Sequence, residues 1–271
     1  MNVEVISKFP SGSPRATPLL FVHGMMHAAW CWDMHFLDYF ALHGYAAHAV
    51  NLRGHGNSAG REKLRWAHIV DYVDDVANAV RQLTSPPILI GHSMGGFVIQ
   101  KYLEDHSAAG AVLLSSPPPS GLLPTALRIA RRQPMAFARC TLTFSLLPVI
   151  AAPELVREAF FSQDLPDSQL VSYWEQMQDE SYRAFLDMVA LDLPQPHKIK
   201  TLLDGKTSGA VRRRVRRCSG VHSVPAATGS DRSPAVASLP ASATRASDVV
   251  VPRCSRPRTR RVSTLDGARR G

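Results

Sequence analysis

One short segment constrains the fold of this chain more than any other. Residues 88–96 read ILIGHSMGG, an apolar run followed by a G-x-S-x-G turn and the start of a helix pattern. Gly91 and Gly95 have no side chains that could collide across so sharp a turn. The pattern predicts a strand, a turn and a helix that project the Ser93 hydroxyl as a nucleophile. The alternative is a glycine-rich turn with an incidental serine, and the strand and helix patterns on either side disfavour it.

Two backbone N–H groups are candidates to stabilise negative charge beside this serine. The Met94 N–H lies in the first turn of the predicted helix, where amides have no intrahelical acceptor and the helix dipole is positive. Residues 21–30 read FVHGMMHAAW, so a second apolar run ends in a His23-Gly24 turn with exposed backbone donors. The Met25 N–H is therefore expected to form the second arm of an oxyanion hole. We interpret His23 as a structural residue that bonds neighbouring backbone.

Strand and helix patterns alternate along the first 116 residues. Strands are predicted from short apolar runs at 3–6, 18–22, 45–52, 88–90 and 111–114. A long helix is predicted from an apolar stripe that runs from Trp66 to Leu83, and Asp71, Asp74 and Asp75 lie off the stripe and are expected to face water. This alternation predicts a doubly wound α/β fold, a mostly parallel sheet covered on both faces.

The motifs resemble those of the α/β-hydrolase family from about residue 3 to 200. They are the His23-Gly24 loop, the RGHGNS turn at 53–58 and the nucleophile turn at 91–95. Their sequences are most similar to those of lysophospholipase-like hydrolases, and residues 27–32 resemble plant esterases of the same fold. The resemblance implies a serine hydrolase that cleaves a carboxylic ester, such as a lysophospholipid or another acyl ester, through an acyl-enzyme on Ser93 and without a cofactor. A serine at the elbow argues against dehalogenases and epoxide hydrolases, and the 53–58 turn is expected to be mainly structural.

The composition of the chain changes abruptly near Thr201. Residues 201–271 contain 15 of the 31 Lys and Arg residues, four of the 22 acidic residues and none of the aromatic residues. The net charge is therefore near −2 before the change (16 basic, 18 acidic residues) and near +11 after it. We predict a core at 1–119 and a helical cap at 120–195. Residues 196–271 are predicted to be a largely disordered tail, because such a composition offers little apolar area against the entropy of ordering.

The family resemblance implies an acid and then a histidine after the cap, and the sequence supplies neither plainly. His106 is about a dozen residues along a helix from Ser93, roughly 20 Å at 1.5 Å per residue. His197 precedes the strand that the family pattern would place next. His222 is the candidate base only because it comes last in chain order, and Asp204 is no better as its acid. We therefore leave the acid unassigned and expect the last strands of the sheet to be missing.

A single reading-frame slip near codon 201 would account for the whole tail. A shifted frame of a G+C-rich gene would yield a tail rich in Arg, Ala, Pro, Ser, Gly and Val, as residues 201–271 are. Loss of the last strands would also leave the run at 111–114 as a bare apolar sheet edge. We therefore predict poor solubility or self-association of this chain.

Three functions compete at this stage. The first is the ester hydrolase, and the second is a catalytically inactive scaffold that retains a small-molecule pocket. The third is nucleic-acid binding through Arg212–Arg217 and Arg253–Arg261, which we disfavour because the tail has no aromatic residues for stacking. No secretory signal, membrane span or metal-ligand spacing is visible, and the scattered cysteines indicate a reducing compartment, so we expect a cytoplasmic protein without bound metal.

Overall fold

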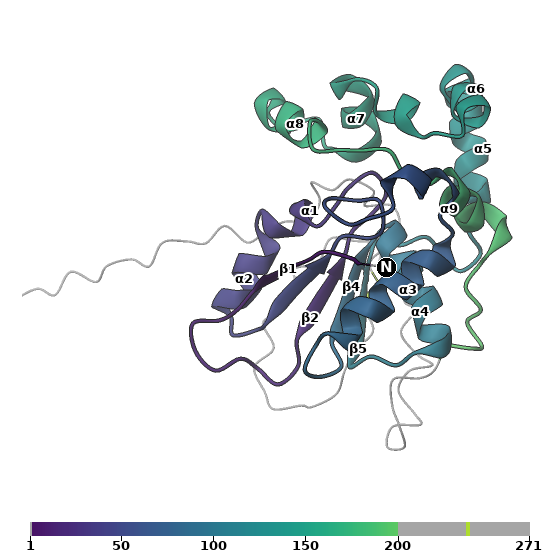
Figure 1. The fold of residues 1–271 in the computed structure, drawn as a ribbon. Helices are drawn as coiled ribbons and strands as arrows, with labels where there is room; N and C mark the ends of the chain where they lie inside the picture. Colours follow the sequence, from purple (N-terminus) through teal and green to yellow (C-terminus); the bar gives the residue numbers. More distant parts are fainter. Residues whose placement is uncertain (1, 200–236, 239–271) are drawn as a thin grey trace, which may run out of the picture.

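A computed structural model describes residues 2–199 and 237–238 of the 271-residue chain. Its sheet has the strand order β1-β3-β2-β4-β5-β6. The strands are β1 (Val5–Lys8), β2 (Leu19–Val22), β3 (Ala47–Val50), β4 (Ile88–His92), β5 (Gly110–Leu114) and β6 (Ala237–Ser238). Only β1 pairs antiparallel, with β3, and the other described pairs are parallel. The structure thus confirms the predicted mostly parallel α/β sheet (Figure 1).

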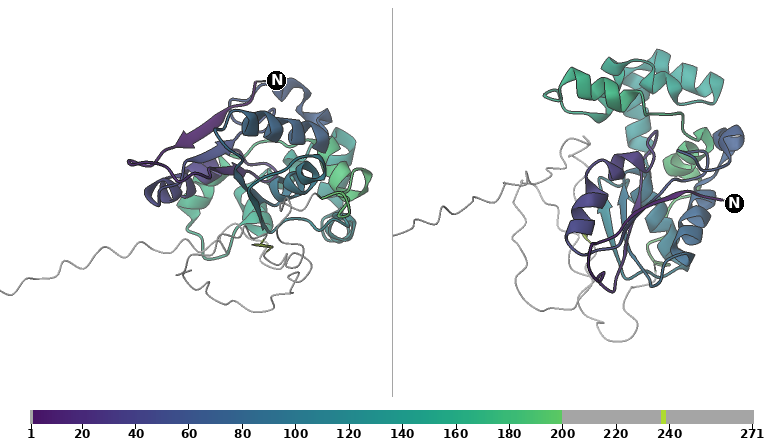
Figure 2. Two further views of the ribbon diagram at one scale, coloured as in Figure 1. Left: turned by 90° about the horizontal axis from the view of Figure 1, so that it is seen from below. Right: turned by 60° about the vertical axis from the view of Figure 1, so that its left-hand side comes forward.

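Helices cover both faces of the sheet, as Figure 2 shows from two directions. One face carries α1 (Trp30–Asp33) and α2 (Phe36–Leu42), and the other carries α3 (Ile69–Arg81) and α4 (Met94–Asp105). Because strand side chains alternate between faces, β2 contributes Leu20 and Val22 to the α3–α4 side and Leu19 and Phe21 to the α1–α2 side. Both faces of β2 are buried, which explains its continuous apolar sequence.

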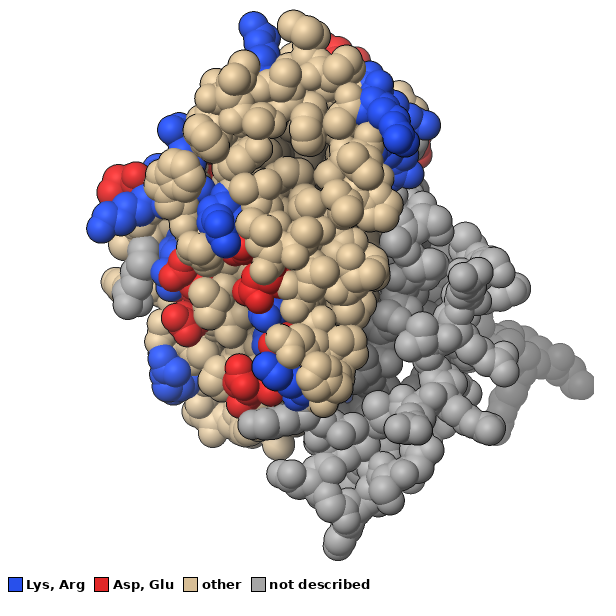
Figure 3. Space-filling model, turned by 90° about the vertical axis from the view of Figure 1, so that its right-hand side faces the viewer, with Lys and Arg blue, Asp and Glu red and all other residues tan. Residues whose placement is uncertain are grey.

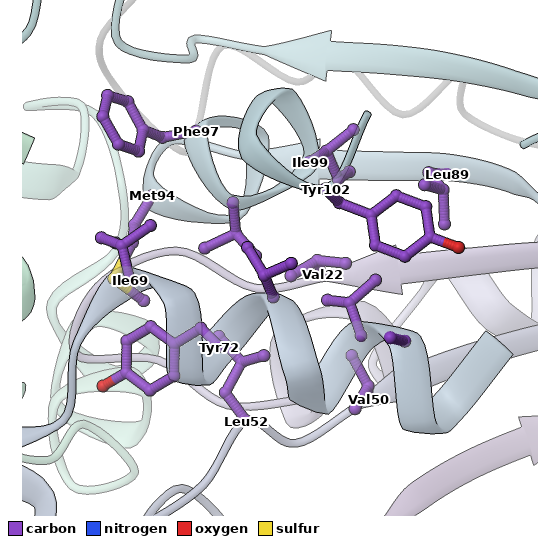
Figure 4. Close-up of a cluster of buried hydrophobic side chains, with 14 of the residues drawn as sticks. Val22, Val50, Leu52, Ile69, Tyr72, Leu89, Met94, Phe97, Ile99 and Tyr102 are labelled. Carbon is purple, nitrogen blue, oxygen red and sulfur yellow. The ribbon is translucent and has the colours of Figure 1, made fainter. Parts of the chain in front are cut away.

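The larger core cluster lies between α3, α4 and the sheet (Figure 4). Tyr72 from α3 and Phe97 and Ile99 from α4 are fully buried there. They contact apolar side chains of the central strands, including Val22 and Leu89. Since burying each large side chain stabilises a fold by about 1.5–3 kcal/mol, this cluster anchors α4, and with it the turn that precedes α4.

A group of helices follows β5 and lies above one end of the sheet (Figure 1). Its members are α5 (Leu123–Arg132), α6 (Pro134–Thr143), the 3₁₀ turn η2 (Leu147–Ile150), α7 (Pro153–Phe160), α8 (Asp167–Trp174), α9 (Tyr182–Leu186) and the π-helical turn η3 (Asp187–Leu191). A separate cluster of buried apolar residues joins α6, η2, α7, α8 and α9 and includes Met26 from the loop after β2. No helix in the described part of the chain is long and apolar enough to cross a membrane.

The long helix begins later than predicted, and one of its acidic residues is buried. Trp66 lies in the 3₁₀ turn η1 (Arg61–Trp66) and is exposed, so it does not extend the buried stripe of α3. Asp75 is fully buried because its carboxylate accepts hydrogen bonds from the Arg53 backbone N–H and guanidinium at 2.9–3.0 Å. The expectation that Asp75 faces water was therefore wrong.

The expectation of a bare edge at β5 also needs correction. β6 pairs in parallel with β5, with Ala237 opposite Val112 and Ser238 opposite Leu113. This pairing covers two of the five residues of β5. The edge is therefore partly covered by a segment that the sequence did not predict as a strand.

Candidate active site

The turn between β4 and α4 has the sharp geometry that the glycine spacing predicted. Ser93 lies between them with φ 50° and ψ −118°, a conformation that is costly for a residue with a side chain. A Cβ atom on Gly91 would lie 2.6 Å from the Gly95 carbonyl carbon and the Gly96 nitrogen. Glycine is therefore required at Gly91, because any larger residue would force the start of α4 away from β4.

Two further glycines bring the loop after β2 against this turn. A Cβ atom on Gly95 would overlap the carbonyl oxygens of Val22 and His23. A Cβ atom on Gly24 would lie 3.3 Å from Ser93 Cβ and 2.9 Å from His92 Nδ1. The absence of both side chains lets the His-Gly loop lie in contact with Ser93.

A cavity of about 120 Å³ opens in front of Ser93. It is lined by Met25, His27, His92, Ser93, Ser115, Ala159 and Phe160. The last two belong to the end of α7, so the helices above the sheet form part of the cavity wall. None of these lining residues is a carboxylate, and Ser93 Oγ has no hydrogen bond to a described residue.

Two backbone N–H groups, one from the cavity-lining Met25 and one from Met94, which follows Ser93 in the chain, are free to bind an anion. Neither the Met25 nor the Met94 amide donates a hydrogen bond to any described residue, and Met94 is the first residue of α4. The next amide in the loop is not available, because the Met26 N–H donates to Glu180 Oε2 at 3.3 Å. The arrangement thus brings to one loop junction the serine and both amides that the sequence had singled out.

Two histidines line the cavity that the sequence reasoning did not assign to the site. The His27 Nδ1–H donates to the Met25 carbonyl at 2.7 Å, which leaves Nε2 without a hydrogen bond to a described residue. Burial lowers the pKa of His27, and burial followed by the nearby His27 lowers the pKa of His92 to about 4. Both rings are therefore neutral at pH 7, and the lowered pKa makes each a weaker base than a free imidazole.

His23 is a structural residue, as we expected. Its Nδ1–H donates to the Gly24 carbonyl at 2.9 Å, and its Nε2 accepts from the Leu52 N–H at 3.2 Å. Burial lowers its pKa to about 3, so the ring is neutral. Nδ1 thus fixes the ring within its own loop and Nε2 joins that loop to Leu52, so neither nitrogen is free for a substrate.

The other histidines considered as bases do not reach this site in the described residues. His106 follows the last residue of α4 and stacks on Tyr102. His197 is exposed, and the nearby Gln195 N–H donates to Glu104 Oε1 near the end of α4 opposite Ser93. His222 and Asp204 lie outside the described residues, so their prediction stays a prediction.

The RGHGNS turn at 53–58 is held by hydrogen bonds and ion pairs to neighbouring segments. Arg53 binds Asp75 and also Asp71, at 2.6 Å. Ser58 Oγ donates to the Asn51 carbonyl and accepts from the Glu4 N–H. These contacts join the turn to α3 and to the first strand, which is the structural role that we had expected.

Comparison with known proteins agrees with this architecture. The model of the alpha/beta hydrolase family matches residues 19–257, and so runs past residue 200, where we had expected the resemblance to end. A non-heme chloroperoxidase from Streptomyces lividans is 37% identical over 107 residues, 38% of this chain and 37% of that protein. A pyrethroid hydrolase from Sphingobium wenxiniae is 28% identical over 102 residues, 37% of this chain and 36% of that protein. The chain thus matches little more than a third of the length of these relatives.

Solved structures share the same fold at low sequence identity. A protein assigned as a non-heme bromoperoxidase from Mycobacterium tuberculosis has a TM-score of 0.55 and 21% identity, with 72% of this chain and 71% of that chain covered. The monoacylglycerol lipase of Paleococcus ferrophilus has a TM-score of 0.50 and 18% identity, with 69% of each chain covered. Since the family model matches most of the sequence and the sheet and turn have the expected geometry, the chain belongs to the alpha/beta hydrolase family.

Proposed function

We propose that this protein is a serine hydrolase that cleaves a carboxylic ester through an acyl-enzyme on Ser93. One observation carries the proposal: Ser93 and Met25 line one cavity, and neither the Met25 amide nor that of Met94, the residue after Ser93, donates to a described residue. Ser93 Oγ would attack the ester carbonyl while its proton passes to a base. The carbonyl oxygen would become an oxyanion held by the two amides, and the alcohol would leave with the proton. Water would then release the acid from Ser93.

The cavity lining suits an acyl group more than a charged one. Met25, Ala159 and Phe160 present apolar surface, and neither a carboxylate nor a Lys or Arg residue is among the lining side chains. Apolar walls with a few polar groups at the reacting centre are typical of small-molecule sites. The names of a pyrethroid hydrolase and a monoacylglycerol lipase among the similar proteins support hydrolysis in general. A lysophospholipid is the finer candidate substrate that we retain from the sequence.

The reaction needs a neutral base, and two histidines are candidates. His222 is the candidate that chain order suggests. His27 lines the cavity, is neutral, and has its Nδ1–H committed to the Met25 carbonyl, so Nε2 carries the free lone pair. Such a fixed tautomer is what a general base requires.

A fluorophosphonate probe tests the proposal directly, because it forms a covalent bond only with an activated hydroxyl. We expect labelling at Ser93, mapped by peptide mass spectrometry, and its loss in Ser93→Ala. His27→Gln and His222→Gln identify the base, provided that each variant melts like the parent. Ser115 lines the same cavity and is the internal control, since labelling there would contradict the assignment of Ser93.

An inactive scaffold that binds a small molecule is the second candidate. It is favoured by the absence of a carboxylate among the lining residues and by the unbonded Ser93 hydroxyl. A folded protein that remains unlabelled by the probe would support this function and overturn the first.

A further inference from the structure

The outer surface of the helices above the sheet carries large apolar side chains exposed to water. Met135 and Leu142 on α6 are 76% and 79% exposed. Other exposed apolar residues extend from α5 to η2: Leu123, Leu127, Ile129, Phe144 and Leu147. We call these residues, with the arginines described below, the cap surface. Figure 3 shows that the upper part of the molecule is largely uncharged in this view, with charged side chains, mostly basic, at its edges.

These exposed side chains are not core residues that lack a partner within the fold. The inner faces of α5 and α6 are already used, because Ala126 and Cys140 are buried. Cys140 contacts the same apolar cluster as Met26 and Val156, and that cluster joins α6 to α7. Each of the two helices therefore buries one apolar side against the fold and exposes further apolar side chains on its outer side.

The cap surface is also strongly basic. Residues 120–153 contain four arginines and no Asp or Glu. Arg128, Arg131, Arg132 and Arg139 are all exposed, and none forms an ion pair with a described residue. Arg157 on α7, by contrast, binds Asp167 at 2.6 Å. Four unpaired positive charges beside exposed apolar side chains call for a partner that offers both negative charge and apolar volume.

We infer that the cap surface docks on an anionic lipid surface. Helices that lie in a membrane interface combine basic residues with large apolar side chains, which enter the boundary between headgroups and acyl chains. A nucleic acid would satisfy the arginines but would leave Met135 and Leu142 in water, because bases bind by stacking on aromatic rings. The lipid surface is the occupant that matches both halves of the surface.

Docking through the cap surface would bring the cavity in front of Ser93 close to the lipid. α6 continues through η2 into α7, and the end of α7 supplies Ala159 and Phe160 to the cavity wall. A protein held at the interface through α5 and α6 would keep the wall of its cavity close to the lipid. The docking itself does not depend on chemistry at Ser93, so it is tested by binding alone.

Vesicle co-sedimentation of the full-length chain tests the proposal. The probes are vesicles of phosphatidylcholine alone and of phosphatidylcholine mixed with phosphatidylglycerol. Reversing two charges with Arg128→Glu and Arg132→Glu should weaken binding to the anionic vesicles by at least roughly 25-fold, because the loss of each positive charge alone costs about fivefold. Met135→Gln with Leu142→Gln should weaken it roughly tenfold, because apolar area no longer leaves water.

Matched controls come from other exposed positions. Arg81→Glu with Lys198→Glu removes the same charge elsewhere, and Leu42→Gln, at 84% exposure, removes an exposed apolar side chain from α2. Every variant retains the basic residues after 201, so their contribution to binding is constant. Circular dichroism and melting temperature check that all variants are folded.

The outcomes separate cleanly. Weaker binding of both cap-surface variants, with unchanged controls, supports the proposal. Equal binding of all variants, or binding lost in high salt and insensitive to the Met135 and Leu142 changes, assigns the interaction to charge elsewhere and overturns it. Failure of the parent chain to bind anionic vesicles also overturns it, and so does tight binding to an oligonucleotide that the arginine variants alone abolish.

Discussion

Replacing Glu180 by glutamine should destabilise the protein by about 3–5 kcal/mol, the usual cost of breaking a buried ion pair on one side. Glu180 is fully buried between the core and the helices above it. Its carboxylate accepts from the Tyr72 hydroxyl at 2.5 Å, the Ser181 N–H at 2.7 Å and the Met26 N–H at 3.3 Å. His55 Nε2 lies 3.2 Å away, at an ion-pair distance but off the direction of an ideal hydrogen bond.

The magnitude follows from what glutamine keeps and loses. Glutamine has nearly the same volume and one acceptor oxygen, so the Tyr72 and Ser181 donors can still be satisfied. Its NH₂ group would face the Met26 N–H, so one donor loses its acceptor, at roughly 1–3 kcal/mol. The buried His55 would also lose its counter-charge, which brings the total into the range above.

The pH dependence gives the reasoning a sharper test. Burial is the largest single influence on His55 and acts to lower its pKa, but the Glu180 charge, the contact with the Glu180 carboxylate and the hydrogen bond to the Arg53 carbonyl together raise that pKa. The pKa of Glu180 is lowered, although burial opposes this, chiefly by the charge of His55. The Glu180 contribution is present above its unfolded pKa of about 4.5 and is lost as the pH falls through the folded value. The His55 contribution is complete below its unfolded pKa of about 6.5 and is lost as the pH rises through the folded value.

The stability difference between the parent protein and Glu180→Gln should therefore be largest between about pH 4.5 and 6.5 and shrink on both sides. Urea denaturation at a series of pH values measures it. Glu62→Gln, an exposed change on η1, is the control and should shift stability by less than about 0.5 kcal/mol at any pH. A Glu180→Gln effect that does not vary with pH would refute the assignment of a charged pair.

Three other expectations follow from the described contacts. Gly95→Ala should destabilise the protein by more than about 3 kcal/mol in denaturation, since its Cβ would overlap carbonyl oxygens at the end of β2; Gly12→Ala, with open space around it, should be neutral. Asp75→Asn should cost about 2–4 kcal/mol because the partly buried Arg53 guanidinium loses its buried counter-charge and keeps only Asp71, whereas the exposed Asp74→Asn should change little in the same assay. The chain should self-associate through β5, which is paired with β6 at only two positions; light scattering that finds a monomer with one cooperative melt would contradict this.

The fold could be predicted from the sequence because its evidence is local. The central strands are buried on both faces, so β2 is a continuous apolar run and β3 is apolar except for His48. The glycines around Ser93 are required by equally local contacts. A Cβ atom at Gly91 would meet the backbone of Gly95, four residues later, and a Cβ atom at Gly95 would meet the end of the adjacent strand β2. A short segment therefore carries enough information for the turn.

The parts that were missed depend on partners distant in the sequence. Asp75 appears solvent-facing by helical period, and only Arg53, 22 residues earlier, explains its burial. His27 and Phe160 meet beside the cavity with ring centroids 5.7 Å apart, although 133 positions separate them. Periodicity within one helix contains no information on which segment packs against it, so such pairs are found only in three dimensions.

The frame-slip hypothesis now makes a structural prediction as well as a compositional one. The site has its serine and both amides from residues before 200, while the described residues around the cavity supply no acid. Among the described residues, β5 is joined to β6 at two positions. If 201–271 is an out-of-frame product, one of the two other frames downstream of codon 200 should encode an apolar strand long enough to pair along Gly110–Leu114. An acidic residue and a glycine-preceded histidine should follow in that order, which would bring both to the carboxyl end of the sheet beside Ser93. Translating those two frames decides the matter, and their failure to encode these three features would reject the hypothesis.

The extension of the family match to residue 257 is the observation against it, because it places part of the tail within the family as it stands.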